Sequence, residues 1–160
     1  MLPMRDYIKR GPYDELWTPS EALQPLIKYL PKSWAYWDCA PGSGQLIEHL
    51  RQAKRIVYNA VEADFFKTDL PDLANMIITN PPYSKKAKFL ERCVELEVPW
   101  ALLLPVTTLG VKRCQIYLRN AEVIFLPKRI DFTGKKNPWF AVAWFTEGLE
   151  IGKQITFVEE

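Results

Sequence analysis

Residues 80–83, Asn-Pro-Pro-Tyr, could hold and polarise an amino group. They directly follow an apolar run that ends at Thr79, so we expect them at the end of a buried strand. Each proline fixes its own φ angle and restricts the residue before it, which makes Asn80 and Pro81 extended and the loop stiff. We expect the side-chain oxygen of Asn80 and the carbonyl oxygen of Pro81 to point into one cleft. Neither Pro81 nor Pro82 has an N–H that would compete for these acceptors.

Two such acceptors match the two hydrogens of an NH₂ group on an sp² carbon. The lone pair of a nucleobase amine is delocalised into the ring, and binding both hydrogens favours a pyramidal nitrogen that can attack a methyl group. Tyr83 then offers an aromatic face for base stacking, which contributes about 1–3 kcal/mol per base. Such a site works by binding, positioning and polarisation. The alternative interpretation is a proline-bounded turn with a core tyrosine.

A second candidate site is the sequence DCAPGSG, residues 38–44. Gly42 and Gly44 allow a tight turn whose backbone lies close to a ligand, directly before a predicted helix. Asp38, at the end of a predicted strand, can accept hydrogen bonds from a cationic or hydroxylated ligand. The third glycine of a dinucleotide fingerprint is missing, so a pyrophosphate is not expected. S-adenosylmethionine, which has an amino-acid tail and an adenosine head, suits a glycine loop flanked by carboxylates.

The elements that must position these residues alternate between helix and strand. We predict helices over residues 20–29, 45–53, 87–96 and 110–120, strands over 34–39, 76–79, 100–105, 122–126 and 139–145, and one or two short strands within 55–66. This alternation predicts an α/β domain with a mainly parallel sheet, in which the last strand, after a turn-rich segment, is antiparallel. In such sheets ligands bind at the carboxyl ends of the strands, where both candidate sites lie.

Basic side chains gather in the middle of the chain. Residues 85–136 carry eleven basic and five acidic side chains, a net charge of +6. The clusters are Lys85, Lys86 and Lys88; Lys112 and Arg113; Lys128 and Arg129; and Lys135 and Lys136. Such a stripe can follow a phosphate backbone, although a solvated helix face or loop tip explains any single cluster equally well. The first cluster directly follows Tyr83, at the rim of the predicted cleft, and this position favours a phosphate contact.

The composition gives little support for a metal site, a disulfide framework, a membrane span or secretion. His49 is the one histidine, and Cys39, Cys93 and Cys114 have neither metal-ligand nor disulfide-framework spacing, so we predict no metal site. The longest apolar stretches are far shorter than the roughly 20 residues of a membrane span. The sequence has no secretion signal at its start, and we therefore expect a cytoplasmic protein.

Four short motifs follow one another along the chain: WTP at 17–19, DCAPGSG at 38–44, DFF at 64–66 and NPPY at 80–83. In this order they resemble the amino-group methyltransferases that use S-adenosylmethionine, most closely the short phage-type DNA adenine-N6 methyltransferases. The resemblance covers most of the chain and includes the segments VIFLPKRIDF and PWFAVAWF. It implies a Rossmann-like class I methyltransferase fold with a mostly parallel sheet, an antiparallel C-terminal strand and helices on both faces.

The resemblance also implies roles for individual residues. The residues implied to hold the target base are Asn80, Pro81, Pro82 and Tyr83. Those implied to line the cofactor are Trp17, Thr18 and Pro19 on its methionine side and Asp38, Ala40, Gly42 and Gly44 in the glycine loop. Asp64 would accept a hydrogen bond from the cofactor's adenine amino group, with Phe65 beside the ring. The residues expected to contact nucleic acid are Lys85, Lys86, Lys88, Lys128, Arg129, Lys135 and Lys136.

The chain departs from the family in its acidic residues. One acid usually follows the second strand and binds the ribose hydroxyls, and another follows the third strand and binds the adenine. Here Glu62 lies only two residues before Asp64, and the helix that normally separates the two strands is missing. Because Glu62 lies 18 residues beyond Gly44, near the usual offset of a ribose acid, we assign it that role. The alternatives are Asn59 or no ribose-binding residue at all.

A second departure is the lack of room for a target-recognition domain. Asn80 lies only 16 positions after Asp64, and 15 residues follow Phe145. We therefore predict one catalytic domain over residues 1–160, with residues 1–16 as an N-terminal arm. Sequence preference would then be short, or would come from loops, a dimer partner or another protein.

The sequence therefore predicts methyl transfer from S-adenosylmethionine to adenine N6 in DNA, with the target base flipped out of the stack. Cytosine N4 in DNA, adenine N6 in RNA and the glutamine amide in proteins present the same kind of NH₂ group and stay open as alternatives. A glutamine enzyme would not need the basic stripe. A non-catalytic nucleic-acid-binding subunit of the same fold is a further alternative, favoured by the compressed acidic region and disfavoured by the intact NPPY motif.

Overall fold

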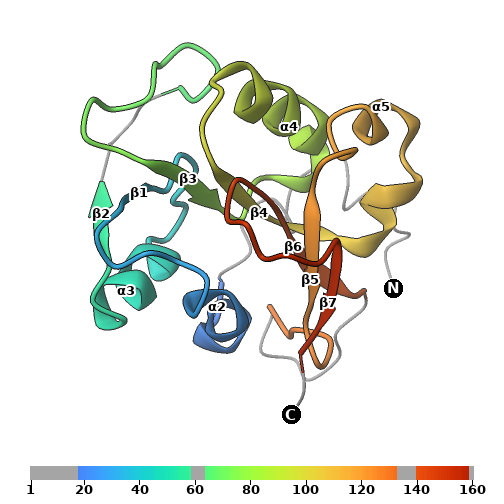
Figure 1. Cartoon of the computed structure of the whole chain (residues 1–160), viewed down its shortest axis with the longest axis horizontal. Helices are drawn as coiled ribbons and strands as arrows, with labels where there is room; N and C mark the ends of the chain where they lie inside the picture. The colour runs from blue at the N-terminus through green and yellow to red at the C-terminus, as the bar shows by residue number, and fades with distance from the viewer. Residues whose placement is uncertain (1–17, 59–63, 133–139, 159–160) are drawn as a thin grey trace.

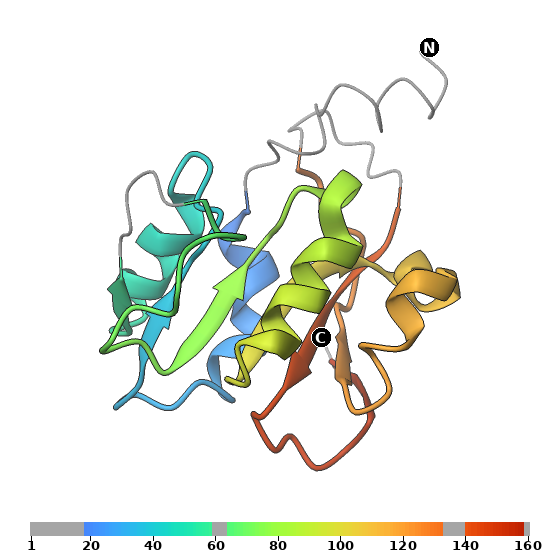
Figure 2. The same cartoon turned by 90° about the horizontal axis from the view of Figure 1, so that it is seen from above.

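The computed structural model describes residues 18–58, 64–132 and 140–158 (Figure 1). Within these residues a seven-stranded sheet lies between two layers of helices. Helices α2 (Ser20–Ile27) and α3 (Gln45–Gln52) cover one face, and α4 (Lys86–Glu95) and α5 (Lys112–Gln115) cover the other (Figure 2). The predicted N-terminal arm, residues 1–16, lies outside the described residues.

The sheet is mostly parallel, as predicted. Its strands are β1 (Ala35–Trp37), β2 (Ile56–Tyr58), β3 (Met76–Thr79), β4 (Trp100–Pro105), β5 (Glu122–Phe125), β6 (Val142–Glu147) and β7 (Ile155–Phe157), arranged in the order β2-β1-β3-β4-β6-β5-β7. Strands β2, β1, β3 and β4 run parallel to one another. Strand β6 lies between β4 and β5 and is antiparallel to both, which confirms the expected antiparallel strand near the C-terminus.

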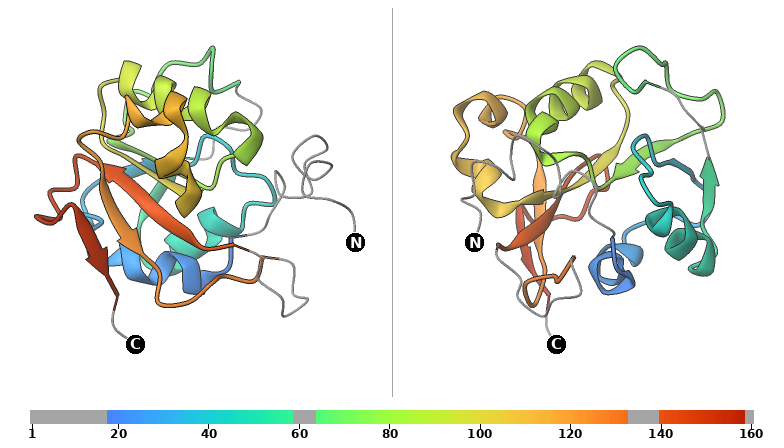
Figure 3. Two further views of the ribbon diagram at one scale, coloured as in Figure 1. Left: turned by 90° about the vertical axis from the view of Figure 1, so that its right-hand side faces the viewer. Right: turned by 180° about the vertical axis from the view of Figure 1, so that it is seen from behind.

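Several elements differ from the sequence prediction. Strand β1 is shorter than the expected 34–39, and β6 runs to Glu147, beyond the expected end at 145. The helix expected over 110–120 is reduced to the four-residue helix α5 (Lys112–Gln115), which follows a 3-10 turn, η2 (Val106–Gly110). Gly110, at the predicted start of the helix, has low helix propensity and belongs to the turn instead. Strand β7 was not predicted, because three residues are too few to show an alternating apolar pattern. It pairs with β5 at the edge of the sheet (Figure 3).

The core is formed by the central strands and the helices packed on them. Strands β3 and β6 are buried along nearly their whole length, and Trp37, Trp100 and Trp144 are fully buried. The indole Nε1 of Trp144 donates a hydrogen bond to the carbonyl of Ala22 at 2.7 Å, which ties β6 to α2. None of the helices in the described part of the chain is long and apolar enough to cross a bilayer.

Arg55 joins the end of α2 to the start of β2. Its buried guanidinium donates hydrogen bonds to the carbonyls of Ile27, Leu30 and Ala53 at 3.0, 3.1 and 2.7 Å. The cation lies at the C-terminal end of α2, where the helix dipole is negative. This contact fixes α2 and therefore the Thr18-Pro19 segment that precedes it.

Candidate active site

Asp38 and Thr79 meet where β1 and β3 end. The hydroxyl of Thr79 donates to Oδ1 of Asp38 at 2.7 Å, and the backbone N–H of Ala40 donates to the same oxygen at 3.2 Å. Burial raises the pKa of Asp38 from its ordinary value of 3.8 to about 6, and the two hydrogen bonds oppose this rise. A cationic group placed beside this carboxyl would favour its ionised form.

The glycine loop that follows Asp38 leads into α3. Gly42 and Gly44 have φ angles of +52° and +80°, which side chains with a Cβ rarely adopt. A Cβ added at either position would have no neighbouring atom within 4 Å. The backbone conformation therefore requires glycine here, and the surface of the loop is open toward a ligand at the start of a helix.

Asn80 is held in a defined orientation by Thr18. Its Nδ2 donates to Oγ1 of Thr18 at 3.1 Å, so the segment before α2 contacts the end of β3. Thr18 itself is buried. The other amide atom, Oδ1 of Asn80, is buried and has no hydrogen-bond partner among the described residues. A buried acceptor without a partner is costly, and such atoms call for a functional or structural explanation.

Tyr83 belongs to an aromatic cluster with Phe132 and Phe140. Its side chain is 8% exposed, and its ring is nearly perpendicular to that of Phe140, with ring centroids 5.9 Å apart. Phe140 in turn stacks on Phe132 at 6.5 Å. Burial raises the pKa of the Tyr83 hydroxyl. The sequence analysis missed Phe132 and Phe140 as site residues, because nothing in the sequence connects them with NPPY.

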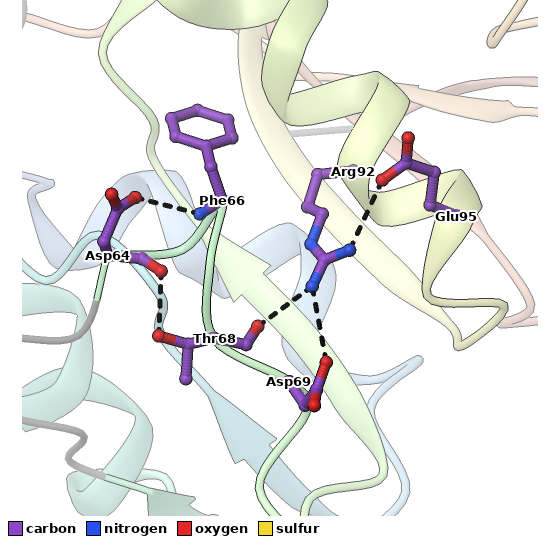
Figure 4. Close-up of polar contacts among 6 residues, drawn as sticks. All are labelled: Asp64, Phe66, Thr68, Asp69, Arg92 and Glu95. Atoms are coloured by element: carbon purple, nitrogen blue, oxygen red, sulfur yellow. Dashed lines mark hydrogen bonds and ion pairs between the residues drawn. The ribbon is translucent and has the colours of Figure 1, made fainter.

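Asp64 lies on a turn beside α4 (Figure 4). Its Oδ1 accepts a hydrogen bond from the N–H of Phe66 at 3.0 Å, and half of its side chain is exposed. Phe65 is only 3% exposed and packs against Trp37 and Phe89, with ring centroids 5.6 and 5.0 Å apart. The turn is thus anchored in the core, and the contact of Phe65 with the cofactor ring stays a prediction.

The predicted basic residues fall into two places. Lys85 and Lys88, which are exposed, and Lys86, whose Nζ lies 3.3 Å from the carbonyl of Tyr83, surround the start of α4. Lys128 and Arg129 are exposed beyond β5, and Nζ of Lys128 lies 3.3 Å from a carboxylate oxygen of Glu21 on α2. Four predicted site residues lie outside the described residues: Trp17, Glu62, Lys135 and Lys136.

The NPPY loop is therefore close to part of the predicted cofactor site. Asn80 contacts Thr18, and the preceding residue, Thr79, contacts Asp38. Pro19 follows Thr18 directly and occupies the N-cap position of α2. Pro81 is buried, and Pro82 leads into η1 (Tyr83–Lys85) with a φ of −55°. These contacts place a potential amine acceptor, Asn80, directly after the residue that bonds to Asp38 at the start of the glycine loop.

The sequence matches no protein-family model and no curated protein sequence. Among solved structures, the chain resembles a putative class I S-adenosylmethionine-dependent methyltransferase from Listeria monocytogenes, with a TM-score of 0.58, 12% identity, and coverage of 94% of this chain and 68% of that chain. It also resembles the 23S rRNA methyltransferase ErmE, with a TM-score of 0.52, 13% identity, and coverage of 81% and 68%. At these identities the likeness concerns the fold, and it confirms the predicted Rossmann-like class I methyltransferase fold.

Proposed function

We propose that this chain transfers a methyl group from S-adenosylmethionine to the exocyclic amine of a nucleobase, with adenine N6 in DNA as the first candidate. The observation that carries the proposal is the side chain of Asn80. Its NH₂ group is held by Thr18, and its oxygen is a buried acceptor with no partner among the described residues. An amine that donates to this oxygen would satisfy it.

The residues present fit the cofactor. The open loop with Gly42 and Gly44 provides backbone for an extended ligand, and Asp38 beside it provides a carboxyl for a cationic amino-acid group. Thr18 contacts Asn80 at the end of β3, and the preceding residue of β3, Thr79, contacts Asp38. Asp64 offers a half-exposed carboxylate for an adenine amino group. When bound, S-adenosylmethionine would supply an electrophilic methyl group, and the electron pair of the broken sulfur–methyl bond would stay on sulfur, giving S-adenosylhomocysteine as the leaving group.

The protein's own residues would then orient and polarise the target amine. Oδ1 of Asn80 and the carbonyl of Pro81 accept its two hydrogens, which frees the nitrogen lone pair to form the bond to carbon. After transfer the nitrogen carries an extra proton that is acidic enough to leave to solvent. No strong base is needed, because positioning and hydrogen bonding carry the catalysis. Tyr83 and its ring partner Phe140 supply aromatic surface for contact with the base.

The basic side chains at the start of α4 support a nucleic-acid substrate. Lys86 and Lys88 lie in the first turn of α4 and Lys85 precedes them, while no acidic residue lies in that turn. Cations at this positive end of the helix dipole are unfavourable for the helix alone, and a bound phosphate would remove the repulsion. We propose that Lys112 and Arg113 on α5 extend this surface, and that Lys128, Arg129, Lys135 and Lys136 form the opposite wall.

RNA is the second candidate substrate. The solved structure of the 23S rRNA methyltransferase ErmE shares the fold, and an adenine in RNA presents the same amine. The acceptors of the NPPY loop do not distinguish the two nucleic acids. The basic surface could follow either backbone, because both are phosphodiesters.

Methyl transfer to several substrates in parallel tests the proposal. Labelled S-adenosylmethionine is incubated with the protein and duplex DNA, single-stranded DNA or RNA, and the nucleosides are then analysed. We expect N6-methyladenine in DNA; the same product in RNA alone would favour the second candidate. Bound cofactor without transfer to any nucleic acid would contradict the proposed substrate class, and absence of cofactor binding would contradict the proposed activity.

A further inference from the structure

The turn that carries Asp64 is a compact hydrogen-bonded unit (Figure 4). The backbone carbonyl of Asp64 accepts hydrogen bonds from the N–H groups of Lys67 and Thr68, both at 2.9 Å, and from the hydroxyl of Thr68 at 2.8 Å. Its carboxylate accepts the N–H of Phe66. The other carboxylate oxygen lies 3.6 Å from Nζ of Lys67. The contacts of the carboxylate are therefore made within the turn, and fixing the far end of the turn restrains the backbone that carries this side chain.

Arg92 of α4 holds that far end. Its Nη2 donates to the carbonyl of Thr68 at 3.2 Å and lies 3.6 Å from Oδ1 of Asp69, while Nη1 bonds to Oε2 of Glu95 at 3.3 Å (Figure 4). The side chain of Arg92 is 20% exposed, whereas that of Asp69 is fully exposed, so the ion pair itself contributes little. The less exposed hydrogen bond to Thr68, with Glu95 steadying the guanidinium, is the main polar link between turn and helix.

The same helix also holds the beginning of the turn. Phe89, one helical turn before Arg92, stacks on Phe65 and contacts Phe66 edge-on at 5.1 Å. Helix α4 directly follows the segment Tyr83–Lys85 at the end of the NPPY motif. One rigid element thus extends from the proposed target-base loop to both ends of the turn that carries the proposed cofactor acceptor.

We infer that Arg92 is a positioning residue for the cofactor's adenine: it fixes the Asp64 turn on α4 so that the carboxylate selects a 6-amino group over a 6-oxo group. This inference rests on the proposed function. Arg92 acts through Thr68 and does not contact the ligand. When the turn is fixed, the carboxylate accepts a hydrogen from a 6-amino group and repels a 6-oxo group; when it is loose, the carboxylate moves away from either.

The test compares binding of S-adenosylhomocysteine with that of its hypoxanthine analogue, S-inosylhomocysteine, by calorimetry. A hydrogen bond to a charged group contributes about 1.5–3 kcal/mol, so wild-type protein should prefer the adenine ligand about 10- to 100-fold. Arg92→Met removes the donors but keeps much of the stem, and it should lose most of this preference. Glu95→Gln, the matched control, leaves the contact between Arg92 and Thr68 in place and should keep it.

A purely structural role predicts a different result. Arg92→Met would then lower the melting temperature and leave the ratio of the two affinities unchanged, which would overturn the inference alone. Should Arg92→Met not fold, Arg92→Gln keeps one donor and is expected to show an intermediate preference; an unchanged preference in that variant also overturns the inference. Failure of the wild-type protein to bind either probe would overturn the proposed function as well.

Discussion

Asp38 is a buried carboxyl whose ionisation is controlled by the fold. Its carboxyl is 2% exposed, and burial raises its pKa to about 6. Because this pKa is higher in the folded than in the unfolded chain, the folded state binds the proton more tightly. The resulting stabilisation is complete below the unfolded pKa near 4 and is lost as the pH rises through about 6.

Asp38→Asn should therefore stabilise the protein without cofactor at neutral pH. The amide keeps an oxygen acceptor for Thr79 and Ala40 but carries no charge to bury. At pH 7.5 the free energy of unfolding should exceed that of wild type by up to about 3 kcal/mol, and the difference should vanish near pH 4. Urea denaturation between pH 4 and 8 measures it. A difference that does not change with pH would contradict this account of Asp38.

Thr18 and Asn80 should act as one unit in catalysis. Thr18→Val removes the oxygen that holds Nδ2 of Asn80 and lets the amide rotate, so we expect kcat to fall about tenfold, the equivalent of roughly one hydrogen bond. In an Asn80→Ala background the same change should have no further effect on kcat. A double-mutant cycle measures this coupling. Additive losses would mean that Thr18 acts independently of Asn80.

These residues also show which features of the site could be predicted from the sequence. The NPPY motif is contiguous, so its stiffness and its acceptors follow from four adjacent residues. The contact between Thr18 and Asn80 spans 62 positions along the chain and depends on how α2 packs, which no local pattern encodes. The contact of Phe140 with Tyr83 was missed for the same reason.

At the scale of elements, the turn between β1 and α3 is the part that we propose binds the cofactor. Gly44 in this turn can be compared with Gly152, a matched control that lies between β6 and β7. The φ angles of Gly44 and Gly152 are +80° and +86°, and a Cβ added at either position would have no atom within 4 Å. Substitution by Ala at either position should cost about 1–2 kcal/mol of stability, because both backbones are left-handed. Only the Gly44→Ala variant should also bind S-adenosylmethionine more weakly.

Thermal unfolding measures the stability of the two variants, and calorimetric titration measures their affinity for S-adenosylmethionine. Similar losses of stability together with a selective loss of cofactor affinity in Gly44→Ala are the expected outcome. Equal cofactor affinity in both variants would remove the glycine loop from the proposed binding site.

The helices and strands with clear apolar patterns in the sequence were the ones that could be predicted. The apolar runs of β3 and β4 gave the observed bounds, and α2, α3 and α4 were found from their apolar spacing. Helix α5 begins later than predicted because Gly110 belongs to the preceding turn, and β7, with three residues, is too short to show an alternating pattern. The insertion of β6 between β4 and β5 depends on long-range pairing, which spacing along the chain cannot specify.

At the scale of the whole molecule, the basic surface at the start of α4 should bind phosphates without regard to base sequence. Lys85 and Lys88 are the residues to change, because Lys86 also contacts the carbonyl of Tyr83. The double variant Lys85→Gln/Lys88→Gln should bind nucleic acid more weakly. The slope of log K against log salt concentration should become shallower by about 2, one unit for each lost phosphate contact.

Lys28→Gln/Lys32→Gln is the matched control. Both lysines are exposed and precede the N-terminal end of β1, whereas the candidate site lies at the carboxyl ends of β1 and β3. This variant should leave the salt dependence unchanged. Equal effects of the two double variants would show that net charge, rather than this surface, governs binding.

The measurement that tests the central claim most directly is single-turnover methyl transfer by wild type and Asn80→Ala. Each protein is saturated with S-adenosylmethionine and with the unmethylated nucleic acid that serves as its substrate. If Oδ1 of Asn80 polarises the target amine, its removal should slow the chemical step about 10²- to 10³-fold, as for other preorganised catalytic groups. Cofactor affinity should stay within about twofold, because Asn80 acts on the target. Transfer at the wild-type rate by Asn80→Ala would contradict the account.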